Sequence, residues 1–188
     1  MYVALVVSAT SSRCKESRSG LSGAFQLDEL ETSEHNRRLC TLTVPVIVQA
    51  ETWFVVHAAP GRLPARGRLR PSDELRKRAW EEAHGKRRNQ SRSATKACIG
   101  ALRDALGSTA KVLLQTDQKR TYPGIIRQVF ARDVAHQSVN SHVRRDRKNL
   151  LLTVNNTFAQ ARDAMSRLDR RNWVHSKLEC RLGWQLWA

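Results

Sequence analysis

Residues 94–117, ATKACIGALRDALGSTAKVLLQTD, decide the fold, because they join an amphipathic helix to an apolar strand. From Ala94 to Leu106 the apolar residues recur at i, i+3, i+4 and i+7, which predicts a helix that Gly107 ends. Lys111–Thr116 contains the apolar run Val112 to Leu114, as is typical of a buried parallel strand. A helix that leads into such a strand is the crossover connection of α/β folds.

Three strands are predicted before this helix. Ala24–Leu30 alternates, with Phe25 and Leu27 on one face and Gln26 and Asp28 on the other. Leu42–Gln49 and Thr52–Ala58 are β-branched and aromatic, and Ala50-Glu51 forms a tight turn between them. These short links favour an antiparallel meander, in which Pro45 must lie near a bulge or an edge, where no ladder hydrogen bond is needed.

Helices are predicted to dominate the rest of the chain. Tyr122–Phe130 is a short helix, the apolar spacing from Val154 to Leu168 gives a longer one, and Asn172–Trp187 gives a third. The expected fold class is therefore α/β, with a mixed sheet (an antiparallel three-strand meander plus a parallel strand) flanked by helices. This element order is also that of the ribonuclease H-like fold.

Composition restricts the classes of partner. The 188 residues include 33 Lys and Arg against 17 Asp and Glu, a net charge of +16, which favours nucleic acid and, less strongly, an anionic membrane surface. No apolar run suits a membrane span, and the N-terminus lacks the features of a signal peptide. The four scattered cysteines form no C-x-x-C pair, so we expect no zinc ribbon or disulfide framework and a reducing cytoplasm.

The charge divides the chain into regions. Residues 1–20 are poorly patterned, and residues 21–188 read as one domain. Residues 62–92 hold eleven basic and four acidic residues together with two prolines and two glycines, which predicts an exposed, partly helical basic insertion. This insertion is either a solvated connector or a surface that contacts phosphates.

Two aspartates stand at telling positions. Asp28 lies in the first predicted strand, and Asp117 directly follows the fourth. If these strands are neighbours, the two carboxylates face each other and repel, and a divalent cation such as Mg²⁺ or Mn²⁺ offsets that repulsion. Each aspartate alone also has an ordinary explanation, Asp28 as a solvent-facing strand residue and Asp117 as a turn residue.

Several segments together resemble insertion-sequence transposases of the DDE class. The resemblance covers the chain from about Gly20 onward and is carried by FQLDELETSEH (25–35), LTVPVIV (42–48), LPARG (63–67), LLQTDQKRTYPGIIRQVF (113–130) and VNNTFAQARDAMSRLDRRNWVHSK (154–177). It implies a ribonuclease H-like catalytic domain that cuts and joins DNA with bound Mg²⁺ or Mn²⁺. Water or a DNA 3′-hydroxyl is then the nucleophile.

The resemblance also assigns a metal site with one departure. Asp28 matches the first acid of the family and Asp117 the second, while the position of the third acid holds Asn155. A basic residue is expected seven positions later on the same helix face, and Arg162 stands there. The subfamily uses asparagine here, or Asp163 supplies the acid, or this copy is inactive. Asn155 or Asn156 as a helix cap is a further reading.

The basic residues of the C-terminal third are expected to follow the DNA backbone; they are Arg162, Arg167, Arg170, Arg171 and Lys177. The expected partners are transposon ends and target DNA, with a homo-oligomer left open and no membrane. The chain lacks the N-terminal DNA-binding region of the family, so it reads as a truncated copy. Its expected location is the bacterial cytoplasm, at the nucleoid.

Three functions follow from these observations. The first is a transposase catalytic domain that performs metal-dependent DNA strand cleavage and transfer. The second is a catalytically inactive truncated transposase remnant that only binds DNA, which the asparagine at 155 motivates. A basic RNA-associated protein explains the charge but not the two aspartates, and it ranks last.

Overall fold

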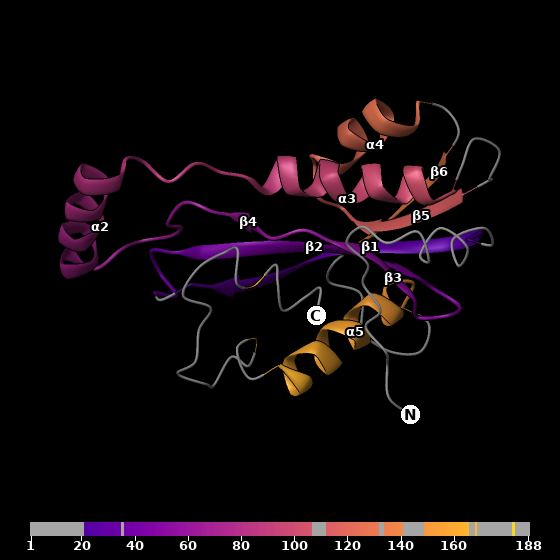
Figure 1. Cartoon of the computed structure of the whole chain (residues 1–188), viewed down its shortest axis with the longest axis horizontal. Helices are drawn as coiled ribbons and strands as arrows, with labels where there is room; N and C mark the ends of the chain where they lie inside the picture. The colour runs from indigo at the N-terminus through magenta and orange to yellow at the C-terminus, as the bar shows by residue number, and fades with distance from the viewer. Residues whose placement is uncertain are drawn as a thin grey trace, which may run out of the picture.

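Strand β1 (Gly23–Ser33) lies at the centre of a mixed sheet (Figure 1). The structure, a computed structural model, describes residues 21–34, 36–106, 112–131, 134–140, 149–165, 168 and 182. The strand order is β3-β2-β1-β5-β6, with the short β4 paired to β2. The other strands are β2 (Thr41–Gln49), β3 (Val55–Ala58), β4 (Gly61–Arg62), β5 (Val112–Asp117) and β6 (Val134–Val139).

The sheet changes direction at β1. On one side, β1, β2 and β3 form an antiparallel meander, as the sequence predicts. On the other side, β5 is parallel to β1 and β6 is parallel to β5. The predicted α/β class with a mixed sheet is therefore confirmed, and so is the parallel direction of the apolar strand at 112–117.

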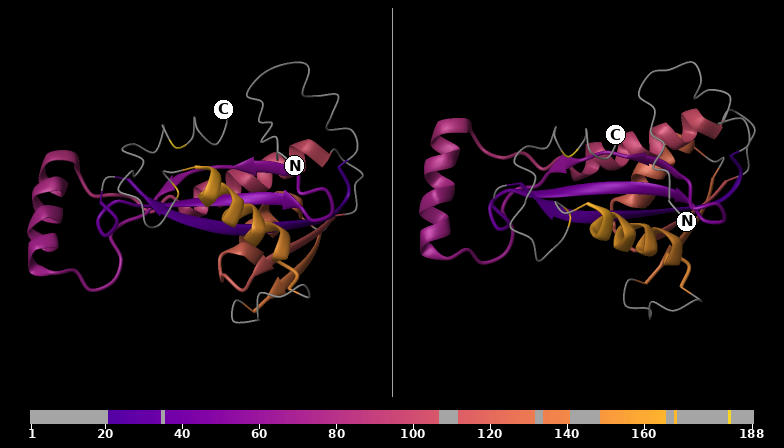
Figure 2. Two further views of the ribbon diagram at one scale, coloured as in Figure 1. Left: turned by 90° about the horizontal axis from the view of Figure 1, so that it is seen from below. Right: turned by 60° about the horizontal axis from the view of Figure 1, so that its bottom comes forward.

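Helices cover both faces of this sheet. Helices α3 (Ser91–Leu106) and α4 (Tyr122–Phe130) lie on one face, and α5 (Leu152–Ala164) lies on the other (Figure 2). Helix α2 (Pro71–His84) stands apart from the sheet at the end of two extended segments (Figure 1). Among the described residues, no helix has the length and apolar character that a membrane crossing needs.

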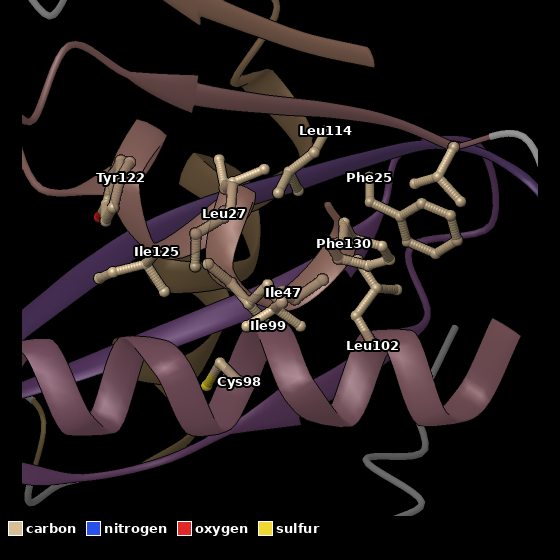
Figure 3. Packing of buried hydrophobic residues seen from close by; sticks show 13 residues of the cluster. Phe25, Leu27, Ile47, Cys98, Ile99, Leu102, Leu114, Tyr122, Ile125 and Phe130 are labelled. Carbon is tan, nitrogen blue, oxygen red and sulfur yellow. The ribbon is translucent and has the colours of Figure 1, made fainter. Parts of the chain in front are cut away.

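Two apolar cores follow from the alternation along β1. Phe25 and Leu27 pack under α3 and α4, together with residues such as Ile99 and Ile125 (Figure 3). Leu30 belongs to the second core, which Val154 and Phe158 of α5 cover. Helix α3 buries positions 91, 94, 95, 98, 99 and 102, the stripe that its 3.6-residue period produces.

Pro45 fits into β2 because of the direction of its backbone groups. Its carbonyl accepts a hydrogen bond from Ala59 N, between β3 and β4, at 3.2 Å. Since the N and O atoms of one residue point to the same side of an antiparallel strand, the missing N–H also faces that junction. The β1–β2 ladder is therefore uninterrupted, and a register shift between Ile47 and Val48 lies close by.

The structure corrects three predicted elements. Strand β3 begins at Val55 and not at Thr52, because residues 50–52 form a turn and Trp53 has a φ of 63°. Strand β6 was not expected. Helix α5 begins at Leu152 and ends at Ala164, where extended backbone at Met165 follows. The predicted helix at 172–187 lies outside the described residues.

Candidate functional site

Asp28 and Asp117 lie at the same level of two neighbouring strands. In the parallel pair of β1 and β5, Leu27 is the partner of Thr116. The next residue on each strand is an aspartate, and neighbouring strands are about 4.8 Å apart. Strand β5 ends at Asp117, whereas β1 continues to Ser33, so the pair lies at the corner where β5 stops.

Both carboxylates belong to the sheet face that α5 covers. The side chains of Gln26 and Gln115 are joined by a hydrogen bond of 3.4 Å across β1 and β5. Each glutamine precedes its aspartate by two residues, and residues two apart share one face of a strand. Asp28 and Asp117 therefore lie on the same face, next to each other.

Backbone amides orient the two carboxylates. Asp28 Oδ1 accepts from Glu29 N at 2.7 Å, and Asp117 Oδ1 accepts from Lys119 N at 3.0 Å. Both aspartates are partly buried. Two carboxylates on adjacent strands repel, and a hard divalent cation bound between their oxygens offsets the repulsion. This pair fits Mg²⁺ or Mn²⁺ in the type of its donor atoms.

Three glutamines form a hydrogen-bonded row across β1, β5 and β6, next to the aspartates, and the first of them binds the start of α5. Gln115 Nε2 donates to Gln137 Oε1 at 3.1 Å, which extends the row from β1 to β6. At the other end, Gln26 Nε2 donates to the carbonyl of Leu150, and Gln26 Oε1 accepts from Val154 N at 2.9 Å. Gln26 thereby fixes the first turn of α5 against β1.

Asn155 is the fourth residue of α5, so the prediction that it caps the helix is wrong. Its Nδ2 donates to the carbonyl of Leu151 at 2.8 Å, within the first turn. The side chain that serves the helix start is Asn149, whose Oδ1 accepts from Leu151 N at 2.8 Å. Because the Asn155 amide nitrogen donates to the backbone of its own helix, its Oδ1 is the atom that could bind a cation.

The flank of α5 that carries Asn155 is the one opposite Thr153. Thr153 Oγ1 donates to the carbonyl of Ala50, at the end of β2. Val154 faces the sheet, and successive helical residues are 100° apart, so Thr153 and Asn155 lie on opposite sides of it. Asn155 is therefore turned away from the β2–β3 turn. Arg162, two turns later and partly buried, shares its flank.

The other predicted site residues have different outcomes. Asp163, the alternative third acid, is exposed on α5. Arg167, Arg170, Arg171 and Lys177 lie outside the described residues. Within the described part of the chain, no three His, Cys, Asp or Glu side chains form a group that could hold a metal ion.

Glu29, for which no role was predicted from the sequence, is a heavily bonded carboxylate. It lies next to Asp28 but on the opposite face of β1, under α3. Lys119 Nζ donates to Glu29 Oε1 and forms an ion pair with it. Four hydroxyl groups surround the same carboxylate, at 2.7 to 3.5 Å; they belong to Thr43, Ser91, Thr95 and Tyr122.

This network sets the protonation of its members. Burial alone would raise the pKa of Glu29, but hydrogen bonds from Lys119, Thr43 and Thr95 and the charge of Lys119 hold it below the ordinary value. Burial, followed by the charges of Glu29, Asp117 and Asp28, raises the pKa of Tyr122. The carboxylate is therefore ionised, and the phenol is a donor.

Lys119 joins this network to the candidate metal site. Its backbone N–H binds Asp117, and its side chain binds Glu29 of β1. Lys119 Nζ also donates to Ser91 Oγ at 2.8 Å. A serine beside a lysine occurs in some hydrolases, but this lysine is held as an ion pair and Ser91 is buried. The arrangement therefore suits positioning and not nucleophilic attack.

No protein-family model matches the chain, and no curated protein is significantly similar to it.

Proposed function

We propose that this chain is the catalytic domain of a DDE-class transposase and that it cuts and joins DNA in a divalent-metal-dependent reaction. The observation that carries the proposal is the register of β1 and β5, in which Leu27 is the partner of Thr116. This register puts Asp28 and Asp117 side by side, as a two-carboxylate metal site requires.

The strand order also supports the proposal. A ribonuclease H-like fold combines a three-stranded antiparallel meander with parallel strands added beside its first strand. The order β3-β2-β1-β5-β6, with β5 and β6 parallel to β1, agrees with that description. Helix α5, which carries Asn155, follows the last strand and packs against β1. We therefore propose the ribonuclease H-like fold for residues 21–188.

Each residue of the proposed site has a role that its chemistry allows. Asp28 and Asp117 bind the cation through carboxylate oxygens, and Asn155 Oδ1 adds a neutral oxygen. Bound Mg²⁺ or Mn²⁺ would stabilise the negative charge that develops on the oxygens around phosphorus during an in-line displacement. Arg162 and the basic residues that follow it in the chain bind DNA phosphates.

A plasmid-nicking assay tests the catalytic proposal. The purified chain is incubated with supercoiled plasmid and Mn²⁺, and the nicking rate of Asp117→Ala is compared with that of the unchanged chain. We expect a loss of about a hundredfold or more, because one of two carboxylate ligands is removed. Asp104→Ala, an exposed aspartate of α3 on the other side of the sheet, is the matched control. Nicking that survives in Asp117→Ala contradicts the site assignment.

A catalytically inactive remnant that only binds DNA is the second candidate, and Asn155 is the observation that favours it. An amide oxygen carries no charge, so the site has one carboxylate fewer than the family pattern. Calorimetric titration with Mn²⁺ separates the candidates. Binding at millimolar concentration or tighter supports the enzyme, and no binding by the unchanged chain supports the remnant.

A pair of neighbouring substitutions sharpens this comparison. If Asn155 faces the two aspartates, Asn155→Asp should tighten Mn²⁺ binding by roughly ten- to a hundredfold. Asn156→Asp adds the same charge one residue later, 100° around the helix, and should change the affinity much less. Equal effects of the two substitutions would show that Asn155 is not a ligand position.

A further inference from the structure

A cationic surface extends along α3 and α4, on the sheet face opposite the aspartate side chains, and includes the linker that leads into α3. Residues 85–106 and 118–131, which form the α2–α3 linker, α3, the β5–α4 loop and α4, contain nine basic residues and one acidic residue, Asp104. Their net charge of +8 is half of the +16 of the chain. We call the exposed cations of these segments the cationic face; they are Lys86, Arg88, Arg92, Lys96, Arg103, Arg120 and Arg127.

The charges of the cationic face lack partners of opposite sign. Arg87 and Lys119, the two basic residues of these segments outside the face, are paired with Glu34 and Glu29. Among the described residues, none of the seven exposed cations forms an ion pair. Three of them bind neutral acceptors only: Arg92 binds Gln128, Arg103 binds the carbonyl of Val129, and Arg127 binds that of Pro123.

Several cations elsewhere on the described surface are paired. Arg38 pairs with Asp73, Arg66 with Glu31, and Lys77 with Glu81. Helix α2 carries three basic and four acidic residues, so it has almost no net charge of its own. Helix α2 therefore does not share the excess of positive charge that α3 and α4 carry.

The shape of the cationic face suits a long, regular polyanion. Helix α3 has 16 residues and is about 24 Å long. Small residues separate its cations, such as Ser93, Ala97 and Gly100, and a Cβ at Gly100 or at Gly124 of α4 would meet no atom within 4 Å beyond the neighbouring backbone of its own helix. A duplex presents about one phosphate charge per 1.7 Å of its axis, or roughly 14 along this helix.

The side chains of this face favour double-stranded nucleic acid over other anionic partners. Membrane-surface helices insert large apolar residues, and the exposed large apolar residues of the described chain, Phe54, Leu75 and Leu150, all lie elsewhere. Single-strand binders stack bases on exposed aromatic rings, but Tyr122 and Phe130, the aromatic residues of these segments, are buried.

We propose that the cationic face binds the phosphate backbone of double-stranded DNA without reading its sequence. This surface is separate from the candidate metal site, and binding there needs no metal ion. It would hold a second stretch of DNA against the face that carries α3 and α4, while Asp28 and Asp117 lie on the α5 face.

The test is the salt dependence of DNA binding in EDTA. Fluorescence anisotropy with a labelled 20-base-pair duplex gives the affinity between 50 and 200 mM NaCl. The slope of log K against log salt is negative, and each lost phosphate contact lowers its magnitude by about 0.9. In the triple variant Arg92→Gln, Lys96→Gln, Arg127→Gln the magnitude of the slope should therefore fall by about 2.7. All three residues are exposed, so far-UV circular dichroism should be unchanged.

A second triple variant controls for net charge. Arg68→Gln, Arg70→Gln, Arg78→Gln removes three exposed cations from the α2 region and lowers the total charge equally. It should change the magnitude of the slope by less than about 0.9, the effect of one phosphate contact. Equal slopes in the two variants, an unchanged slope in the first, or tighter binding of an RNA duplex or single strand of the same length would overturn the proposal. Because EDTA removes divalent cations, this measurement of DNA binding does not depend on whether the chain cleaves DNA.

Discussion

Lys119 carries the only counter-charge that the described residues place on Glu29. Its side chain is 29% exposed and that of Glu29 is 10% exposed, so the pair is largely shielded from water. Lys119→Met should lower the free energy of unfolding by about 2–3 kcal/mol, because an ionised carboxylate is left without its cation. Urea denaturation at pH 7 measures the loss.

The exposed Lys96 of α3 is the matched control for this substitution. Lys96→Met removes the same charge and side-chain volume where no carboxylate depends on it, and it should leave the unfolding midpoint almost unchanged. In the double variant Glu29→Gln, Lys119→Met the loss should be smaller than in Lys119→Met alone, because no unpaired charge remains. Similar losses for Lys96→Met and Lys119→Met would contradict this role of the ion pair.

The sequence contains a signal for Glu29 but not for its partner. Strand alternation puts Glu29 on the same face as Phe25 and Leu27, which are apolar, and a charged residue among buried positions requires compensation. Its partner Lys119 is 90 residues away and lies in a loop. The register between β1 and β5 brings the two residues together, and a local sequence pattern cannot predict a contact over so large a sequence separation.

His136 gives stability a dependence on pH. Its Nε2 lies 2.9 Å from Thr116 Oγ1, and burial lowers the pKa of His136 below its ordinary value of 6.5. A group with a lowered pKa binds fewer protons in the folded than in the unfolded chain, so stability rises with pH. Its contribution is complete above pH 6.5 and is lost as the pH falls through the lowered value.

Substitution of this histidine isolates its contribution. His136→Gln keeps a polar side chain without a titrating group, so the variant should gain stability relative to the unchanged chain between pH 8 and pH 5. Guanidinium denaturation at both pH values gives the two differences in unfolding free energy. A difference that is the same at pH 8 and pH 5 would show that His136 does not titrate at a lowered pKa.

Helix α5 depends on one side chain of β1 for its position. Gln26 accepts a hydrogen bond from the N–H of Val154 and donates one to the carbonyl of Leu150. Gln26→Leu leaves the buried N–H of Val154 and the partly buried carbonyl of Leu150 without this partner and should cost about 1–3 kcal/mol. It should also weaken Mn²⁺ binding, because Asn155 follows Val154 directly. Gln137→Leu, at the exposed end of the same row, is the control, and equal losses in both variants would argue against this role of Gln26.

Elements with a strong period could be predicted, and elements without one could not. The apolar stripe of α3 follows from spacing, and the predicted bounds of α4, Tyr122–Phe130, are confirmed. Strand β6, VAHQSV, lies at the edge of the sheet and has few apolar residues, so its sequence carries little strand signal. Helix α5 begins two residues before its first stripe residue, Val154, because Asn149 and Gln26 serve its first turn.

At the scale of the molecule, the candidate site depends on topology. That Asp28 and Asp117 share a level could be predicted only on the assumption that the first strand and the strand at 112–117 are neighbours. The crossover helix α3 makes that arrangement natural, and the structure has it. The flank on which Asn155 lies could not be predicted, because it depends on how α5 packs against β1 and β2.

The uneven charge also predicts how salt affects the whole molecule. Seven uncompensated cations on one face repel one another in the folded chain and less in the expanded unfolded chain, so self-repulsion destabilises the fold. Salt screens this repulsion, since the Debye length falls from about 30 Å at 0.01 M to about 10 Å at 0.1 M. The free energy of unfolding should therefore rise from 10 to 200 mM NaCl.

Two variants test whether the cationic face causes this rise. In Arg92→Gln, Lys96→Gln, Arg127→Gln the free energy of unfolding should be higher at 10 mM NaCl and should rise less with salt. In Arg68→Gln, Arg70→Gln, Arg78→Gln it should depend on salt as in the unchanged chain. Urea midpoints across the series measure this, and a midpoint that falls with salt in the unchanged chain would mean that attraction between charges, and not repulsion, dominates the folded surface.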